Sequence, residues 1–134
     1  MRWSSLLIGY LATALALFAI DLVWLRVIAI DWYRQGLGHL MAPEVNFVAG
    51  GLFYLVFPVG LMVFAVVPQI SAPWWRASAA AALFGFFAYA TYDLTNLATL
   101  RDWPLSLSLI DMAWGAFASA CAATAGWAAV SALK

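Results

Sequence analysis

The sequence from Ala88 to Trp114 reads AYATYDLTNLATLRDWPLSLSLIDMAW and joins two long apolar segments through a short connection. The letters RDWP, at Arg101–Pro104, bring charged residues and a proline together, and proline is a strong signal for a turn. Because the connection is short, the segments on either side are predicted to be antiparallel neighbours. The same stretch carries Asp93 and Asp111, two carboxyl groups in otherwise apolar surroundings.

The composition predicts a membrane protein. Of the 134 residues, 67% are hydrophobic and 9% are charged, and the mean hydropathy is +0.96. Soluble domains have about 45–50% apolar and about 25% charged residues, and a chain of this size has too much surface for its volume to bury the excess in water. We therefore expect the lipid bilayer to surround most of a single domain, residues 1–134.

Four segments are apolar over the length of about 20 residues that a membrane-spanning helix needs. Their predicted ranges are 3–27, 46–67, 74–100 and 106–133. The longer link between the first two contains Gly36, Gly38 and aromatic residues that favour the headgroup layer, which predicts a short interfacial helix. The expected fold is therefore an all-α, integral membrane four-helix bundle. Small residues repeat at four-residue spacing in the last segment and predict close helix packing there. They are Gly115, Ser119 and Ala123, and Ala118, Ala122 and Gly126.

Four spans would place both termini on one side of the membrane. The Lys and Arg residues that set orientation divide equally, with Arg2, Arg76 and Lys134 on the terminal side and Arg26, Arg34 and Arg101 on the other. The acids of the connections all lie on that other side. We predict that both termini are cytoplasmic.

Three aspartates within the predicted spans are candidates for a functional site, because carboxyl groups in lipid are costly and usually face the bundle interior. Asp21, Asp93 and Asp111 all fall in the membrane half remote from the termini, since alternate helices run in opposite directions. Further polar or aromatic residues belong to the same half: Tyr54, Tyr89, Tyr92, Asn96, Asn46, Trp24 and Trp114.

The spacing of these residues sharpens the prediction. Tyr89, Tyr92, Asp93 and Asn96 stand at i, i+3, i+4 and i+7, so one helix face carries all four. The pattern Asp-x-x-Trp occurs at Asp21 and again at Asp111, and in each case the indole N–H is a potential donor to a carboxylate, directly or across helices. Three nearby carboxyls in a low-dielectric site cannot all ionise comfortably, so we expect Asp93 to exchange a proton and to act in function.

Structural alternatives stay open for each aspartate. Asp111 follows Ser108 by three residues and so resembles the end of a capping box, while Asp21 precedes Arg26 by five and is a candidate ion-pair partner. Asp93 is alternatively a hydrogen-bonded strut. The tryptophans at the ends of the spans are expected to be anchors at the membrane interface. They are Trp32, Trp74, Trp75 and Trp103.

Other functional signatures do not occur. The single Cys and single His exclude the usual multi-ligand zinc and iron–sulfur sets, no cofactor signature is evident, and zero net charge does not favour nucleic acid. Three function classes remain open. They are acid–base chemistry on a lipid-like or isoprenoid-like substrate, proton-coupled or cation-coupled transport by a small carrier, and a non-catalytic accessory or assembly role. A homodimer is an open alternative for the carrier, because four spans leave a narrow pathway.

Several motifs also carry a resemblance to a known family. They read AIDLVWL, GLFYLVFPVGLMVFAV, GFFAYATYDLTNLATLRDWP and LIDMAWGAF. Together they resemble the bacterial membrane proteins of domain-of-unknown-function family 2177. The resemblance implies a bacterial integral membrane protein of four spans, and it supplies no reaction. We expect the protein to lie in the bacterial inner membrane. It points to seven motif positions: Asp21, Tyr54, Tyr92, Asp93, Asn96, Asp111 and Trp114.

Overall fold

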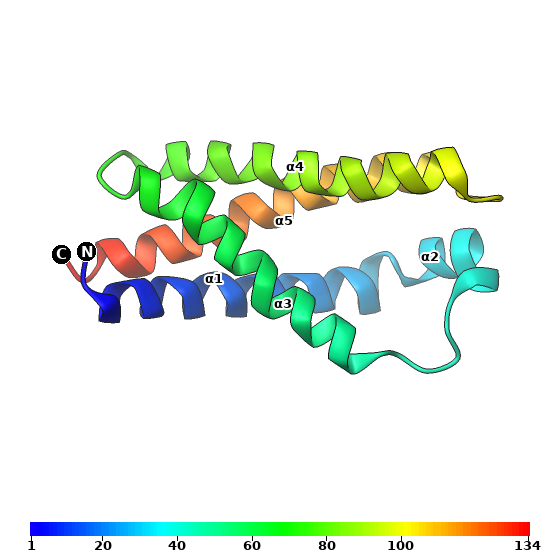
Figure 1. Ribbon diagram of the computed structural model, residues 1–134, viewed down its shortest axis with the longest axis horizontal. Coiled ribbons are helices and arrows are strands. Elements are labelled where there is room, and N and C mark those ends of the chain that lie inside the picture. The colour runs from blue at the N-terminus through cyan, green and yellow to red at the C-terminus, as the bar shows by residue number, and fades with distance from the viewer.

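The computed structural model describes residues 1–134 and is entirely helical (Figure 1). The elements are α1 (Trp3–Val23), continued by a π-helical turn (Trp24–Ile28); α2 (Ile30–Leu37), followed by a 3-10 turn (Gly38–Leu40); α3 (Phe47–Leu61), continued by a π-helical turn (Met62–Val66) and a 3-10 turn (Val67–Gln69); α4 (Trp74–Thr99); and α5 (Leu105–Ser131). The predicted all-α bundle, with a short helix between its first two long helices, is confirmed.

Three of the helical segments are long and apolar enough to cross a membrane: Trp3–Ile28, Phe47–Gln69 and Leu105–Ser131. Helix α4 is 26 residues long, but it is less hydrophobic than these segments and is not among them. It nevertheless runs antiparallel along α5 (Figure 1). A bilayer crossed by α5 would also surround α4, which supports a fourth crossing at 74–100. That crossing stays a prediction.

The turn between α4 and α5 has the predicted form. Helix α4 ends at Thr99, and α5 begins at Leu105 directly after Pro104. Between them Asp102 has a φ of 60°, the only positive φ of a non-glycine residue, and Asp is among the residues that tolerate this left-handed conformation. The tight turn holds the Asp93 end of α4 beside the Asp111 start of α5.

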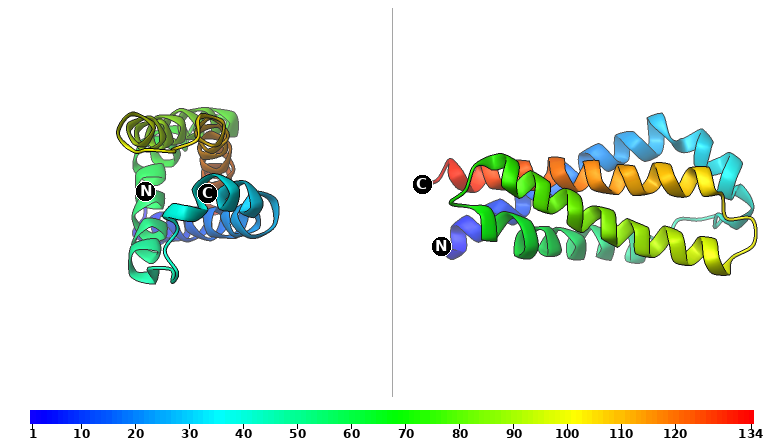
Figure 2. Two further views of the ribbon diagram at one scale, coloured as in Figure 1. Left: turned by 90° about the vertical axis from the view of Figure 1, so that its right-hand side faces the viewer. Right: turned by 90° about the horizontal axis from the view of Figure 1, so that it is seen from above.

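Helix α5 packs against both α1 and α4, and the end-on view shows the long helices arranged around a common axis (Figure 2). Small residues permit the close approach. Gly85 of α4 lies against Ser119 and the carbonyl group of Gly115, and Gly126 lies against Thr13 of α1. The predicted packing role of the small residues in α5 is therefore confirmed.

Helix α3 crosses the bundle obliquely, and its N-terminal end diverges from α4 (Figure 1). The helix contains Pro58 and leads into a π-helical turn, and both features commonly bend helices. Its buried residues, Pro58 and Leu61, both lie in its last turn, whereas Phe47 and Val56 are 80% and 64% exposed. Much of the surface of α3 before Pro58 is therefore apolar and exposed, although Phe53 and Tyr54 turn toward the bundle.

The apolar core is separated from the polar side chains along the bundle. It consists of Leu17, Leu61, Met62, Ala65, Val66, Ala81, Ala118, Ala122 and Ala123. Most of these residues come from the helix halves nearer the two termini, whereas α2 covers the opposite end (Figure 1). Dispersion contacts between small and aliphatic side chains hold the terminal half together, which leaves the opposite half for the three aspartates.

Candidate functional site

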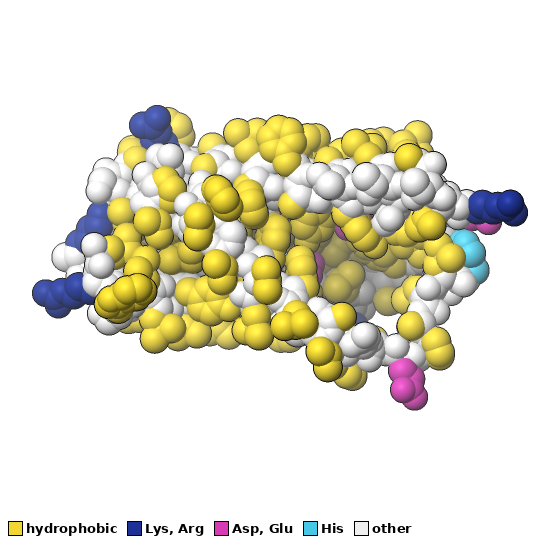
Figure 3. Space-filling model, in the orientation of Figure 1, with side chains coloured by type: hydrophobic (Ala, Val, Ile, Leu, Met, Phe, Trp, Pro, Cys, Tyr) yellow, Lys and Arg dark blue, Asp and Glu magenta, His cyan; other side chains and the backbone are white.

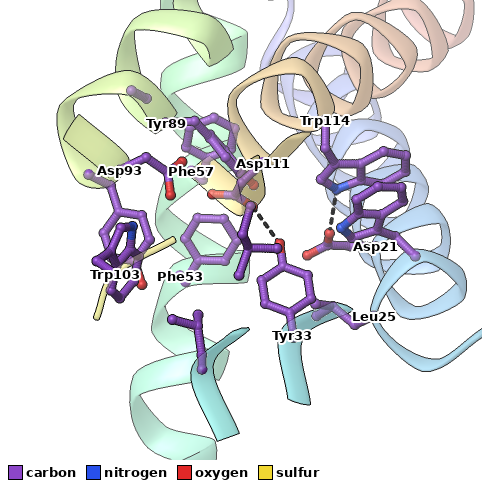
Figure 4. A pocket seen from close by; sticks show the side chains of 15 residues that line it. Asp21, Leu25, Tyr33, Phe53, Phe57, Tyr89, Asp93, Trp103, Asp111 and Trp114 are labelled. Atoms are coloured by element: carbon purple, nitrogen blue, oxygen red, sulfur yellow. Dashed lines mark hydrogen bonds between the residues drawn. The ribbon is translucent and has the colours of Figure 1, made fainter. Parts of the chain in front are cut away.

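The half of the bundle remote from the termini contains a cavity of about 410 Å³ (Figure 4). All five helices and the α4–α5 turn contribute side chains to its wall. The lining residues are Asp21, Trp24, Leu25, Tyr33, Leu37, Phe53, Phe57, Ala88, Tyr89, Tyr92, Asp93, Trp103, Leu107, Asp111 and Trp114. Most of this wall is apolar or aromatic, and its only ionisable groups other than tyrosines are three carboxyls.

The structure brings the three predicted aspartates together in this cavity. Asp21 comes from α1, Asp93 from α4 and Asp111 from α5. Their side chains are 6%, 2% and 8% exposed, respectively. Burial of three carboxyls is costly unless each is hydrogen-bonded, so the surroundings of each one decide what it can do.

Asp21 has a hydrogen bond at each oxygen. The Tyr54 hydroxyl donates to Oδ2, and Trp114 Nε1 donates to Oδ1 at 2.9 Å. The Trp114 ring in turn stacks on Trp24, with ring centroids 4.4 Å apart and planes 5° from parallel. The predicted indole–carboxylate bond across helices is confirmed, and the alternative pairing of Asp21 with the exposed Arg26 is wrong. Asp21 is a fixed strut between α1, α3 and α5.

Asp111 accepts a hydrogen bond from α2. The Tyr33 hydroxyl donates to its Oδ1 at 2.6 Å. Burial and, next, the negative charge of Asp111 raise the pKa of Tyr33 above its ordinary value, so the hydroxyl keeps the proton that it donates.

The capping role considered for Asp111 is wrong, because α5 begins at Leu105 and the carboxyl lies in its second turn. Ser108, the other half of the proposed capping box, makes different bonds. Its Oγ donates to the Pro104 carbonyl at 2.9 Å and accepts from Trp103 Nε1 at 2.9 Å. Asp111 is therefore free to face the cavity.

Asp93 differs from the other two aspartates. Its side chain is 2% exposed, yet Oδ2 has no hydrogen-bond partner. The carboxyl is a neighbour of Asp111 in the cavity wall, and a hydrogen bond between two carboxyls would require a shared proton because carboxylates only accept. Leaving a buried polar atom unpaired costs about 1–3 kcal/mol. Among the three aspartates, Asp93 is the only one with a fully buried oxygen that has no hydrogen-bond partner.

The remaining predicted residues divide into two groups. Tyr89 and Tyr92 line the cavity beside Asp93, and Trp24 and Trp114 form its opposite wall. Tyr54 does not line the cavity but holds Asp21. Asn96 is half-buried and lies outside the lining. The placement of Asn46 in the site is wrong: it caps the N-terminus of α3, where its Oδ1 accepts from Ala49 N at 3.1 Å.

Sequence reasoning missed several residues of the wall. Tyr33 was expected only in an interfacial helix and Trp103 only as an interface anchor, whereas both side chains line the cavity. Phe53 and Phe57 of α3 were not singled out, although their i, i+4 spacing places them on one helix face. That spacing is the one sequence signal available for these two residues. It does not show which part of the protein this face of α3 contacts.

The cavity is not a preformed metal centre, since no three His, Cys, Asp or Glu side chains converge as a metal would need.

A family model described as "Predicted membrane protein (DUF2177)" matches residues 6–128. The chain belongs to this family. All the cavity residues of this DUF2177 member lie inside the matched range, and the membership identifies it as a multi-pass membrane protein. No curated protein and no solved structure matches the chain.

Proposed function

We propose that the protein binds a lipid-like molecule in this cavity and carries out acid–base chemistry on it, with Asp93 as the carboxyl that exchanges the proton. The observation that carries the proposal is the state of Asp93, which is deeply buried and has an unpartnered Oδ2 inside an apolar-walled cavity. Buried carboxyls in such surroundings are candidates for acid–base chemistry. A purely structural strut would have both oxygens engaged, as Asp21 does.

The Asp93–Asp111 pair supports the proposal chemically. Two facing carboxyls that share one proton place an acid beside a base, and paired carboxyls recur in enzymes for this reason. Tyr33 binds Asp111 and so orients the second member of the pair. Asp21, held by Tyr54 and Trp114, keeps the aromatic wall in place rather than reacting.

The location of the cavity supports a lipid-like ligand. It lies inside one chain, so the site is complete without a second protomer, as an enzyme site would be. The space-filling view shows a hollow on the long side of the bundle, with hydrophobic side chains around it and acidic atoms at its floor (Figure 3). Because a bilayer crossed by the long apolar helices surrounds the bundle, its long side faces lipid. We place the protein in the bacterial inner membrane.

The experiment uses the purified protein in nanodiscs that contain a total bacterial lipid extract. Wild type, Asp93→Asn and Asp102→Asn are incubated in parallel, and the lipids are quantified by mass spectrometry over time. We expect the wild type to convert one lipid species and Asp93→Asn to leave it unchanged. Asp102→Asn is the matched control, because it makes the same substitution at an exposed turn residue outside the cavity.

Two results would contradict the proposal. Equal conversion by wild type and Asp93→Asn would remove the role of the carboxyl. If the wild-type protein retains a lipid through purification but converts none, its function is binding or transport and not catalysis.

A further inference from the structure

Two buried polar atoms of the cavity have no partner, and they are of opposite kinds. Asp93 Oδ2 is an acceptor, and Trp24 Nε1, which lies beside the Tyr33 hydroxyl without a hydrogen bond to it, is a donor on a side chain that is 9% exposed. The other indole N–H groups of the wall are engaged, since Trp103 donates to Ser108 and Trp114 donates to Asp21. A ligand that completes the site must therefore donate a hydrogen bond and also accept one.

Headgroup chemistries differ in whether they meet this requirement. A hydroxyl both donates and accepts, so a headgroup with hydroxyls can satisfy both atoms. An ionised phosphate or carboxylate offers only acceptors to Asp93, and an ammonium group offers only donors to Trp24. The unpartnered pair thus matches an alcohol better than an acid or an amine.

The charges of the wall exclude acids for a second, independent reason. Three carboxyls line the cavity, and no Lys, Arg or His does. The nearest arginines in sequence, Arg26, Arg34 and Arg101, are exposed. A phosphate or carboxylate headgroup would be buried next to like charges without a cation, which is strongly unfavourable at low dielectric.

The cavity opens toward lipid on the side where α3 and α4 separate. The Phe57 ring marks their last close approach, at 5.5 Å from the Phe84 ring and 6.2 Å from the Tyr89 ring. Beyond it, the first half of α3 diverges from α4 (Figure 1), and the hollow lies on this face (Figure 3). A volume of about 410 Å³ is at the lower end of the range of roughly 300–1,000 Å³ for ligand pockets. It suits a headgroup whose chain leaves through the open side.

We infer that the cavity selects an uncharged amphiphile with a hydroxyl headgroup, and that the molecule moves sideways out of the bilayer between α3 and α4. This inference rests on the proposed function and names its substrate class. Asp93 accepts the hydroxyl proton in a hydrogen bond, Trp24 donates to an oxygen of the headgroup, and Phe53 and Phe57 contact the chain.

The test compares oleoyl probes that share one chain and differ in headgroup. Monooleoylglycerol, oleoyl lysophosphatidic acid, oleate and oleylamine are added to the detergent-purified full chain, and binding is measured by native mass spectrometry. We expect monooleoylglycerol to bind at one molecule per chain. We expect lysophosphatidic acid and oleate, whose charged groups cannot donate to Asp93, to bind at least about tenfold more weakly, the factor that follows from losing a hydrogen bond to a charged group. Oleylamine, which cannot accept from Trp24, should bind at least about threefold more weakly.

Variants link the selectivity to the two atoms. Asp93→Asn should weaken monooleoylglycerol binding by about tenfold, and Trp24→Phe, which removes the donor but keeps an aromatic ring, by about threefold or more. Asp102→Asn should bind as the wild type does. Because binding is measured without turnover, folding of each variant is checked separately by its unfolding transition.

The outcomes separate this inference from the proposed function. Equal or tighter binding of lysophosphatidic acid, oleate or oleylamine that still depends on Asp93 overturns the headgroup assignment and leaves the proposed function standing. Wild-type monooleoylglycerol binding that neither Asp93→Asn nor Trp24→Phe weakens overturns the assignment of the two atoms. Failure of all four probes to bind overturns both the inference and the proposed lipid-like ligand.

Discussion

Two substitutions of the same kind should differ in their effect on the stability of this protein: Asp21→Asn should lower it, and Asp93→Asn should not. In Asp21→Asn, one acceptor oxygen is replaced by an NH2 donor, although both Asp21 oxygens accept hydrogen bonds, from Tyr54 and from Trp114. The amide oxygen can accept from only one of these two donors, and the NH2 group cannot accept from the other. A hydrogen bond to a charged group contributes about 1.5–3 kcal/mol in soluble proteins, and side-chain bonds between membrane helices reach about 1.7 kcal/mol. We therefore expect a loss of about 1–2 kcal/mol.

Asp93→Asn should have no such cost. Its Oδ2 has no donor to lose, and an amide in its place can donate to the facing Asp111. Removing an unpaired buried acceptor relieves a penalty of about 1–3 kcal/mol, part of which the new amide offsets through its own unpaired hydrogen. We expect a free energy of unfolding that is unchanged or raised by up to about 1 kcal/mol, although the activity is lost.

The assay is reversible unfolding by SDS in mixed micelles, followed by tryptophan fluorescence, with wild type, Asp21→Asn, Asp93→Asn and the exposed control Asp102→Asn. The control should stay within about 0.5 kcal/mol of the wild type. Destabilisation of Asp93→Asn by as much as Asp21→Asn would show that both carboxyls are struts, and it would refute the distinction between an engaged and an open aspartate.

Three further predictions concern packing, ionisation and orientation. Gly85→Ala should lose about 1–3 kcal/mol of stability, because its Cβ would overlap Ser119. Gly50→Ala, with open space around it, should gain about 0.5–1 kcal/mol. SDS unfolding compares the two variants, and equal free energies of unfolding would contradict the close α4–α5 contact. Because burial raises the pKa of Tyr33, its contribution to stability should be complete below about pH 10 and be lost as the pH rises further. Unfolding measured at pH 9 and pH 11 should thus show a larger loss for the wild type than for Tyr33→Phe, and equal losses would contradict it. A reporter fused after Lys134 should be active in the cytoplasm, and activity only in the periplasm would reverse the orientation.

The long helices could be predicted because hydropathy and turn residues act locally. PQISAP and RDWP mark the turns that the structure places before α4 and α5, and each long apolar run became a helix. The alternating direction of these helices was enough to place Asp21, Asp93 and Asp111 at one depth. The polar residues that were misplaced, such as Asn46, lie at helix ends, where a side chain can bond to its own backbone instead.

What the sequence by itself determined is the class of protein, the helices and the depth of the three carboxyls, because the bilayer imposes the same apolar length on every span. What only the tertiary structure decided is which carboxyl is engaged and which is open. Tyr33 reaches Asp111 across 78 residues of sequence, and Trp114 reaches Asp21 across 93. Such pairings depend on how each helix is rotated and tilted against its neighbours, and above all on the divergence of α3. Rotation and tilt arise from packing between helices, and no local pattern of residues specifies them.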